Sequence, residues 1–272
     1  MIYSSMTETV RLIIFICFCI VPENCEVSIL LRFYYVILIS LPFILFYLGK
    51  ALYIEKHDAR YTEADRYRIA RRAISILQRN GFIRTNAYGT ENLPCDGGYV
   101  MYSNHQGKYD ALGIMSAHQA PCTVMIDDKR SHQLITTQFI SLLKGIRLDK
   151  TDMKKQVKTI LDAIRQVKEG RRIIIFPEGG YYRNRNEVHD FLPGAFKCAM
   201  KSQTPIVPVA LIDSYKPFEL NSLKPVTTQV HFLSPILYEE YKEMNSKEIA
   251  DLTRARIVEK INEVCHKNRS PF

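Results

Sequence analysis

Residues 98–110 read GYVMYSNHQGKYD, and this stretch sets the expected fold. A short apolar run at 98–102 is followed by polar residues and a glycine, and a helix-like sequence begins at Asp110. An apolar run bounded by turn residues predicts a buried strand, and strand, loop and helix in this order form the unit of an α/β fold. Functional side chains gather at the carboxyl ends of such strands, so His105 and Asp110 are candidate site residues.

Further strands and helices are predicted on the C-terminal side of this unit. Four apolar runs predict strands at 122–126, 172–176, 205–211 and 229–233. Helical periodicity is clearest over 152–169. Alternating strands and helices predict an α/β domain over residues 51–272, with a mixed, largely parallel sheet flanked by helices.

The first fifty residues, 1–50, are expected to form a separate membrane-associated helical segment. The run 12–21 is too short to cross a bilayer, whereas 27–49 would reach about 35 Å as a helix and could span it. A true span and a hairpin in one leaflet both fit this pattern, and a buried soluble helix is the alternative. Basic residues outnumber acidic ones seven to four over 50–72, which places the α/β domain on the cytoplasmic side.

Charge and cysteine usage narrow the function classes. The net charge of +9 favours anionic partners such as phospholipid headgroups or phosphorylated metabolites. No nucleic-acid-binding module is recognised, so nucleic acid is not an expected partner. The seven cysteines include no Cys-x-x-Cys pair, which argues against a disulfide framework or a zinc site, and no metal is expected.

His105 and Asp110 are the candidate catalytic pair. Five residues of regular helix turn about 500°, so the two side chains would point about 140° apart in one helix. They can meet if His105 lies in the loop and Asp110 in the first helical turn. An imidazole held by a carboxylate is suited to take a proton near neutral pH. The alternative is a surface histidine beside an aspartate that caps the helix.

A second motif, Phe176-Pro177-Glu178-Gly179-Gly180, ends another predicted strand. Glycines let backbone N–H groups approach an anion closely, and arginine side chains can hold phosphate. The alternative is a tight turn with solvated charges. The candidate substrate-binding residues are Arg147, Lys150, Glu178, Gly179, Gly180, Arg183 and Arg185.

Four blocks in order resemble the 1-acylglycerol-3-phosphate acyltransferases, also called lysophosphatidic acid acyltransferases. The blocks are Asn104-His105-x4-Asp110, Gly145–Lys150, Phe176–Gly179 and Pro205–Val209. The chain departs from the family pattern at Gly180 and Tyr181, where the family usually has Thr and Arg. It also has Lys150 where the second block usually ends in Arg.

The resemblance implies transfer of a fatty acyl group from acyl-CoA or acyl carrier protein to the 2-hydroxyl of lysophosphatidic acid, giving phosphatidic acid at a membrane surface. His105 would be the general base, Asp110 would orient it, and no cofactor would be needed. An acyltransferase for another lysolipid and a non-catalytic protein that binds anionic membranes are the alternatives. A metal-dependent phosphohydrolase with His105, Asp110 and Glu178 as ligands is a further one.

Overall fold

The computed structural model describes residues 26–133, 135–181, 184–219 and 224–267, and it describes side chains in the first helix from Leu38 onward. The predicted apolar run at 12–21 and the candidate residue Arg183 lie outside these ranges.

The described residues form one seven-stranded sheet with the order β1-β7-β6-β2-β5-β3-β4. Neighbouring strands are parallel except for the pair β6 and β7, so the predicted mixed, largely parallel sheet is confirmed. The strands are β1 (Ile83–Tyr88), β2 (Tyr99–Ser103), β3 (Thr123–Asp127), β4 (Ile146–Leu148), β5 (Arg172–Ile175), β6 (Ile206–Ile212) and β7 (Val226–Phe232).

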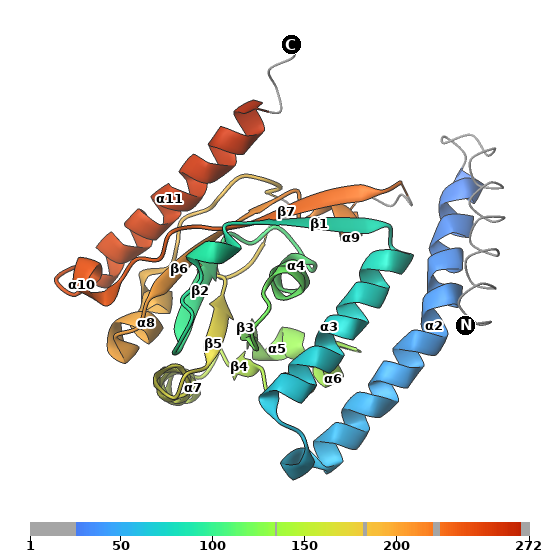
Figure 1. Ribbon diagram of the computed structural model, residues 1–272, viewed down its shortest axis with the longest axis horizontal. Helices are drawn as coiled ribbons and strands as arrows, with labels where there is room; N and C mark the ends of the chain where they lie inside the picture. Colours follow the sequence, from blue (N-terminus) through green and yellow to red (C-terminus); the bar gives the residue numbers. More distant parts are fainter. Residues whose placement is uncertain (1–25, 134, 182–183, 220–223, 268–272) are drawn as a thin grey trace.

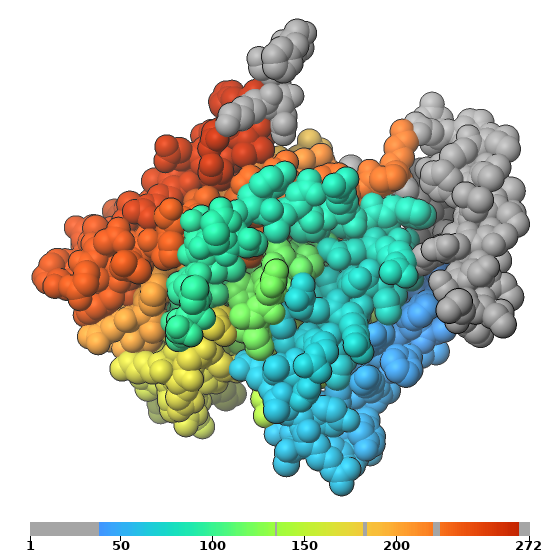
Figure 2. Space-filling view, in the orientation of Figure 1, coloured from blue at the N-terminus to red at the C-terminus, as the bar shows by residue number. Residues whose placement is uncertain are grey.

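Helices cover both faces of the sheet (Figure 1). The first face carries α2 (Glu26–Lys56), α3 (Glu63–Asn80), α4 (Asp110–Ala117) and α6 (Thr136–Leu142). The second carries α7 (Met153–Lys168), α8 (Lys197–Ser202) and α11 (Ser246–Lys267). The short helices are α5 (Asp128–Ser131), α9 (Lys216–Glu219), α10 (Tyr238–Tyr241), η1 (Asp58–Arg60), η2 (Thr90–Asn92) and η3 (Pro193–Phe196). In the space-filling view α11 and the pair α2 and α3 occupy opposite sides of the molecule (Figure 2).

Strand β2 shows why its sequence reads as one unbroken apolar run. Successive side chains of a strand point to opposite faces of the sheet. Tyr99 and Met101 therefore join the core under α3 and α4, while Val100 and Tyr102 join the core under α7 and α11. Because both faces are covered by helices, no polar alternation is needed in this strand.

Helix α2 reaches the edge of the sheet where β2 and β5 end. Strand β1 is antiparallel to β2 through β7 and β6, so it begins at this edge, directly after α3 ends. Asn80, the last residue of α3, donates to the hydroxyl of Ser40 at 3.1 Å. The part of α2 before Ser40 therefore projects past this edge. Figure 1 shows the N-terminal end of α2 beyond the start of β1.

By length and composition α2 contains one segment, Leu38–Lys56, that is apolar enough to cross a membrane, and it is the one such segment in the described part of the chain. Several of its large apolar side chains are exposed, among them Leu38, Leu45 and Phe46. The expected domain boundary at residue 50 falls inside this continuous helix and stays a prediction.

Candidate active site

The loops after β2 and β5 meet because these two strands are parallel neighbours in the sheet. Parallel strands end at the same edge, so the loop with His105 and the turn with Glu178 lie side by side. A direct hydrogen bond joins them, in which the backbone N–H of His105 donates to Glu178 Oε1 at 2.8 Å. The two sequence motifs thus form one site.

His105 and Asp110 form a hydrogen-bonded pair. His105 Nδ1 lies 2.7 Å from Asp110 Oδ2. Asp110 is the first residue of α4 and is fully buried, whereas the His105 side chain is 17% exposed. A carboxylate can only accept, so the proton of the neutral imidazole sits on Nδ1 and leaves Nε2 with a free lone pair. This geometry suits a general base.

Backbone N–H groups hold the Asp110 carboxylate in this position. Asp110 Oδ2 also accepts from the N–H of Gly107 at 2.9 Å and from the N–H of Gln106. Its other oxygen, Oδ1, has no hydrogen-bond partner in the described part of the chain. Three donors on one oxygen fix the carboxylate, and the carboxylate in turn fixes the ring of His105.

Two aromatic rings frame the imidazole. The ring of Phe176 stacks on His105 with ring centroids 4.3 Å apart, and Tyr181 meets it edge-on at 4.8 Å. The guanidinium of Arg130 lies over the Tyr181 ring, 5.2 Å from its centroid. These contacts limit the rotation of His105 and bring a cation from the loop after β3 close to it.

Glu178 is buried and faces protein N–H donors. Besides the N–H of His105, its carboxylate accepts from the backbone N–H of His189 at 3.3 Å and from Asn184 Nδ2 at 3.4 Å. Burial raises the pKa of Glu178 from 4.5 to about 7, although the two backbone N–H groups act in the opposite direction. A carboxylate in this position repels an anion, so Glu178 is better placed to join the two loops than to hold a phosphate.

Arg147 lies within β4 and Lys150 follows it, and their side chains make different contacts. Lys150 Nζ donates to the carbonyl of Gly179 at 2.7 Å and pairs with Asp127 at 3.4 Å, so it lies at the site. Arg147 donates to the hydroxyls of Ser131 at 3.1 Å and Ser141 at 3.0 Å. Its guanidinium therefore braces the segment of α5 and α6, while Lys150 keeps its charge beside the glycine turn.

The remaining candidates lie along the turn after β5. Gly179 has φ +75, and an added Cβ would come 2.9 Å from Cδ1 of Leu192, so the turn requires glycine here. Gly180 follows it and is buried. Arg185 has its guanidinium 5.9 Å from the ring centroid of Tyr215.

The sequence motifs gave no role to three residues that shape the site. Arg130 was one of many surface charges, and only its placement over Tyr181 distinguishes it. Asn104 exchanges two hydrogen bonds with the backbone of Leu211 in β6, at 3.0 and 2.8 Å. Gln106 accepts from the N–H of Ser214 at 2.8 Å. Leu211 and Ser214 lie more than a hundred residues away along the chain, so no local signal could have revealed these contacts.

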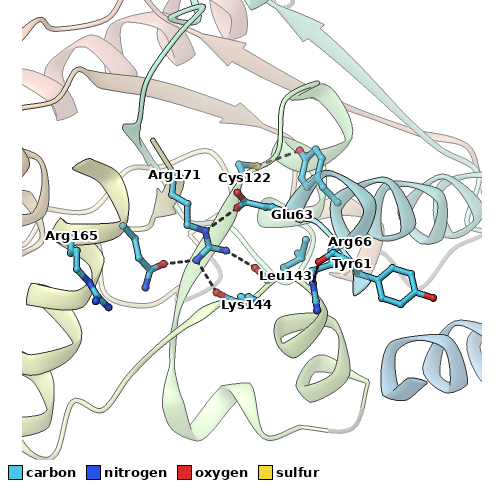
Figure 3. Close-up of a pocket in the computed structure, with 10 residues that line it drawn as sticks. Tyr61, Glu63, Arg66, Cys122, Leu143, Lys144, Arg165 and Arg171 are labelled. Atoms are coloured by element: carbon cyan, nitrogen blue, oxygen red, sulfur yellow. Dashed lines mark hydrogen bonds and ion pairs between the residues drawn. The ribbon is translucent and has the colours of Figure 1, made fainter. Parts of the chain in front are cut away.

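A pocket of about 440 Å³ lies at the opposite edge of the sheet. Its walls include Cys122, Lys144 and Arg171, which precede β3, β4 and β5. Figure 3 shows the Arg171 guanidinium bonded to Glu63 and to the carbonyls of Leu143 and Lys144. No candidate catalytic residue lines this pocket, and its central cation is already paired within the protein.

Known proteins resemble this chain across the sheet and both loops. The acyltransferase family model matches residues 84–212. A 1-acyl-sn-glycerol-3-phosphate acyltransferase of Salmonella typhimurium is 30% identical over 173 residues, which is 62% of this chain and 69% of that protein. A protein of the same name from Borreliella burgdorferi is 28% identical over 186 residues, 65% of this chain and 71% of the relative.

The fold also has a solved counterpart. The crystal structure of the 1-acyl-sn-glycerophosphate (LPA) acyltransferase PlsC from Thermotoga maritima superposes with a TM-score of 0.70. The match covers 91% of this chain and 99% of that one at 22% sequence identity, which supports the fold.

Proposed function

Because the chain belongs to the 1-acyl-sn-glycerol-3-phosphate acyltransferase family, we propose that it acylates lysophosphatidic acid. In this proposal a fatty acyl group moves from acyl-CoA or acyl carrier protein to the 2-hydroxyl of the acceptor, and phosphatidic acid is formed. The observation that carries the proposal is the pair of His105 and Asp110 at 2.7 Å, joined to the glycine turn after β5 by a 2.8 Å hydrogen bond.

The proposed reaction needs one proton acceptor and no covalent enzyme intermediate. His105 Nε2 takes the proton of the 2-hydroxyl while the hydroxyl oxygen attacks the thioester carbonyl carbon. The new C–O bond forms and the carbonyl electron pair moves to its oxygen. When that pair returns, the C–S bond breaks, and the imidazolium gives its proton to the leaving thiolate. General-base catalysis contributes about 10²–10⁴ in rate, so positioning of the two substrates must supply much of the rest.

The cations around the site favour an acceptor that carries phosphate. Lys150 lies at the glycine turn, and Arg185 follows the same turn. We assign Glu178 to the positioning of the His105 loop, since its oxygens face N–H groups. This division of labour revises the initial hypothesis that Glu178 contacts the acceptor phosphate.

We also propose that α2 attaches the site to a membrane, with the α/β domain in the cytoplasm. The part of α2 before Ser40 projects past the edge of the sheet where His105 lies, so a lipid acceptor in a membrane around that part would be close to the base. The excess of basic residues after position 50 supports the cytoplasmic orientation.

The proposed chemistry uses no metal or other cofactor, since the hydroxyl is activated by the imidazole. Within the described ranges, no group of three His, Cys, Asp or Glu side chains is placed to hold a metal ion. His105 Nδ1, Asp110 Oδ2 and Glu178 Oε1 are each engaged in hydrogen bonds inside the protein. These contacts favour a base with its supports over the phosphohydrolase alternative.

An assay of purified membranes that contain this chain tests the proposal. Labelled acyl-CoA and acyl carrier protein are offered in turn, together with lysophosphatidic acid, other lysophospholipids or monoacylglycerol. We expect product to form with lysophosphatidic acid, and we expect the rate of its formation to be unchanged by a chelator. A strong preference for a lysolipid without a terminal phosphate, or loss of activity with chelator, would contradict the proposal.

A further inference from the structure

Arg130 is a cation near the active site that has no role in the reaction proposed above. It lies in α5, in the loop after β3, and its side chain is exposed. Within the described part of the chain, its guanidinium lies 5.2 Å from the ring centroid of Tyr181 and makes no ion pair or hydrogen bond. By contrast, Arg147 in the neighbouring strand has its guanidinium bonded to Ser131 and Ser141.

The contact with Tyr181 directs this cation toward the catalytic histidine. The Tyr181 ring lies between the two groups, edge-on to His105 with centroids 4.8 Å apart. The two contacts in series keep the Arg130 guanidinium carbon within about 10 Å of the imidazole centroid. An arginine over an aromatic face retains its N–H donors at the rim of the guanidinium for an incoming anion.

A second cation, Lys150, and the carboxylate of Asp127 lie in the same part of the site. Asp127 accepts from the backbone N–H of Arg130 at 3.3 Å, which anchors the start of α5. The same side chain pairs with Lys150 at 3.4 Å, and Lys150 reaches the carbonyl of Gly179. Cations from the loops after β3 and β4 therefore converge on the turn that carries Tyr181.

From this arrangement we propose that Arg130 binds the phosphate of the acceptor lipid, with Tyr181 as the residue that positions it. The inference rests on the proposed function and names the residue that selects a phosphorylated acceptor. In lysophosphatidic acid the phosphate is carried by the carbon adjacent to the one with the reacting hydroxyl. A cation one aromatic ring away from the base is at the right separation for that group. The planar guanidinium can bind two phosphate oxygens at once, which a lysine cannot do.

Binding measurements on the full-length chain test the assignment without turnover. The background is His105→Ala, and the probes are lysophosphatidic acid and monoacylglycerol with the same acyl chain, which lacks the phosphate. Arg130→Ala should weaken binding of the phosphorylated probe about 10- to 100-fold and leave binding of the other within about twofold. Lys129→Ala, an exposed neighbour, is the matched control and should change neither. Equal binding of lysophosphatidic acid by Arg130→Ala and the control overturns the proposal.

The role of Tyr181 has its own test. Tyr181→Phe keeps the aromatic face and should retain affinity, whereas Tyr181→Leu removes it and should shift affinity toward that of Arg130→Ala. In the double variant Arg130→Ala/Tyr181→Arg, a cation returns beside His105 and should restore part of the lost affinity for lysophosphatidic acid. No restoration, together with full affinity in Tyr181→Leu, would remove Tyr181 from the account.

Steady-state kinetics with His105 intact shows whether Arg130 binds the acceptor or the acyl donor. Arg130→Ala should raise the KM for lysophosphatidic acid and leave the KM for the acyl donor unchanged. A rise confined to the donor KM would mean that Arg130 binds donor phosphates, and it would overturn the assignment. A wild-type chain that neither binds nor acylates lysophosphatidic acid overturns the proposed function as well, whereas an active wild type with an unaffected Arg130→Ala variant overturns this inference alone.

Discussion

Replacing Asp110 by asparagine removes the charge that faces His105 and keeps the shape of the side chain. Asp110 Oδ2 accepts from His105 Nδ1, Gln106 N and Gly107 N, and Oδ1 has no partner among the described residues. The amide oxygen can take over all three hydrogen bonds, and the amide nitrogen can lie where Oδ1 was. The reverse orientation would set the amide N–H groups against two backbone N–H groups, so the His105 tautomer is preserved.

The loss in this variant is therefore mainly electrostatic. A carboxylate and an imidazolium at 2.7 Å attract each other by about 6 kcal/mol at an effective dielectric constant of 20. The neutral hydrogen bond remains, and His105 is partly exposed, so about half of this energy is lost. About 3 kcal/mol corresponds to roughly a 100-fold decrease in kcat.

The assay measures kcat for acylation of lysophosphatidic acid and the free energy of unfolding for Asp110→Asn. We expect the unfolding free energy to stay within about 1 kcal/mol of the wild type, because the donors from His105, Gln106 and Gly107 keep their acceptor and the atom at the Oδ1 position has no partner in either protein. Asp152→Asn is the matched control. Asp152 caps α7 through the N–H groups of Lys154 and Lys155, and asparagine caps equally well. A kcat for Asp110→Asn within threefold of the wild type would contradict this electrostatic role of Asp110.

Three further perturbations test the supports of the site, the far pocket and the membrane helix. The raised pKa of Glu178 means that the folded state holds its proton more tightly, so this group stabilises the protein fully below pH 4.5, and about 3 kcal/mol of that stability is lost as pH rises to about 7. In urea unfolding, the free energy of unfolding should fall more between pH 5 and pH 8 in the wild type than in Glu178→Gln. An equal fall in both proteins would contradict this expectation. Arg171→Ala removes the hydrogen bonds to the Glu63 carboxylate and to the carbonyls of Leu143 and Lys144, and it should destabilise the protein by about 2–4 kcal/mol in thermal unfolding. The exposed Arg165→Ala should cost under about 1 kcal/mol, and similar values for both variants would contradict the structural role of Arg171. Leu45→Glu should weaken binding to phospholipid vesicles about tenfold or more in a flotation assay, and Leu237→Glu, of similar exposure outside α2, should not; equal effects would argue against α2 as the membrane contact.

The meeting of the two site loops was predictable from local sequence. The runs before Asn104 and at 172–176 read as buried strands, and parallel strands end at one edge of a sheet. The five-residue spacing of His105 and Asp110 also required a loop followed by a first helical turn, and the structure has Asp110 as the first residue of α4. These features depend on steric rules within a few residues, which is why the sequence carries them.

Other features depend on contacts between distant segments. Strand β1 was not predicted because its residues, IRTNAY, contain no apolar run, and it lies at an edge of the sheet paired with β7. Periodicity located α7, but Met153, Val157 and Leu161 lie on its exposed side, while Ala163 and Val167 pack on the sheet. A repeat of apolar residues identifies a helix without fixing which of them are covered.

The roles of Glu178 and Arg130 could not be predicted from the sequence either, because they too depend on contacts between separate segments. A carboxylate beside two glycines suggested an anion pocket, yet its direction is set by the N–H groups of His105 and His189. The place of Arg130 depends on the ring of Tyr181, about fifty residues away along the chain. The His105 donor follows β2 and the Tyr181 ring follows β5, so each comes from a loop other than that of the residue it contacts, while His189 comes from further along the loop of Glu178.

The proposed reaction depends on His105 as the base that activates the acceptor hydroxyl. The most direct measurement is kcat for acylation of lysophosphatidic acid by His105→Ala, with membrane binding and unfolding measured on the same preparation. We expect a decrease of about 10²–10⁴-fold while the variant stays folded and membrane-bound. A folded, membrane-bound variant with kcat close to that of the wild type would contradict it.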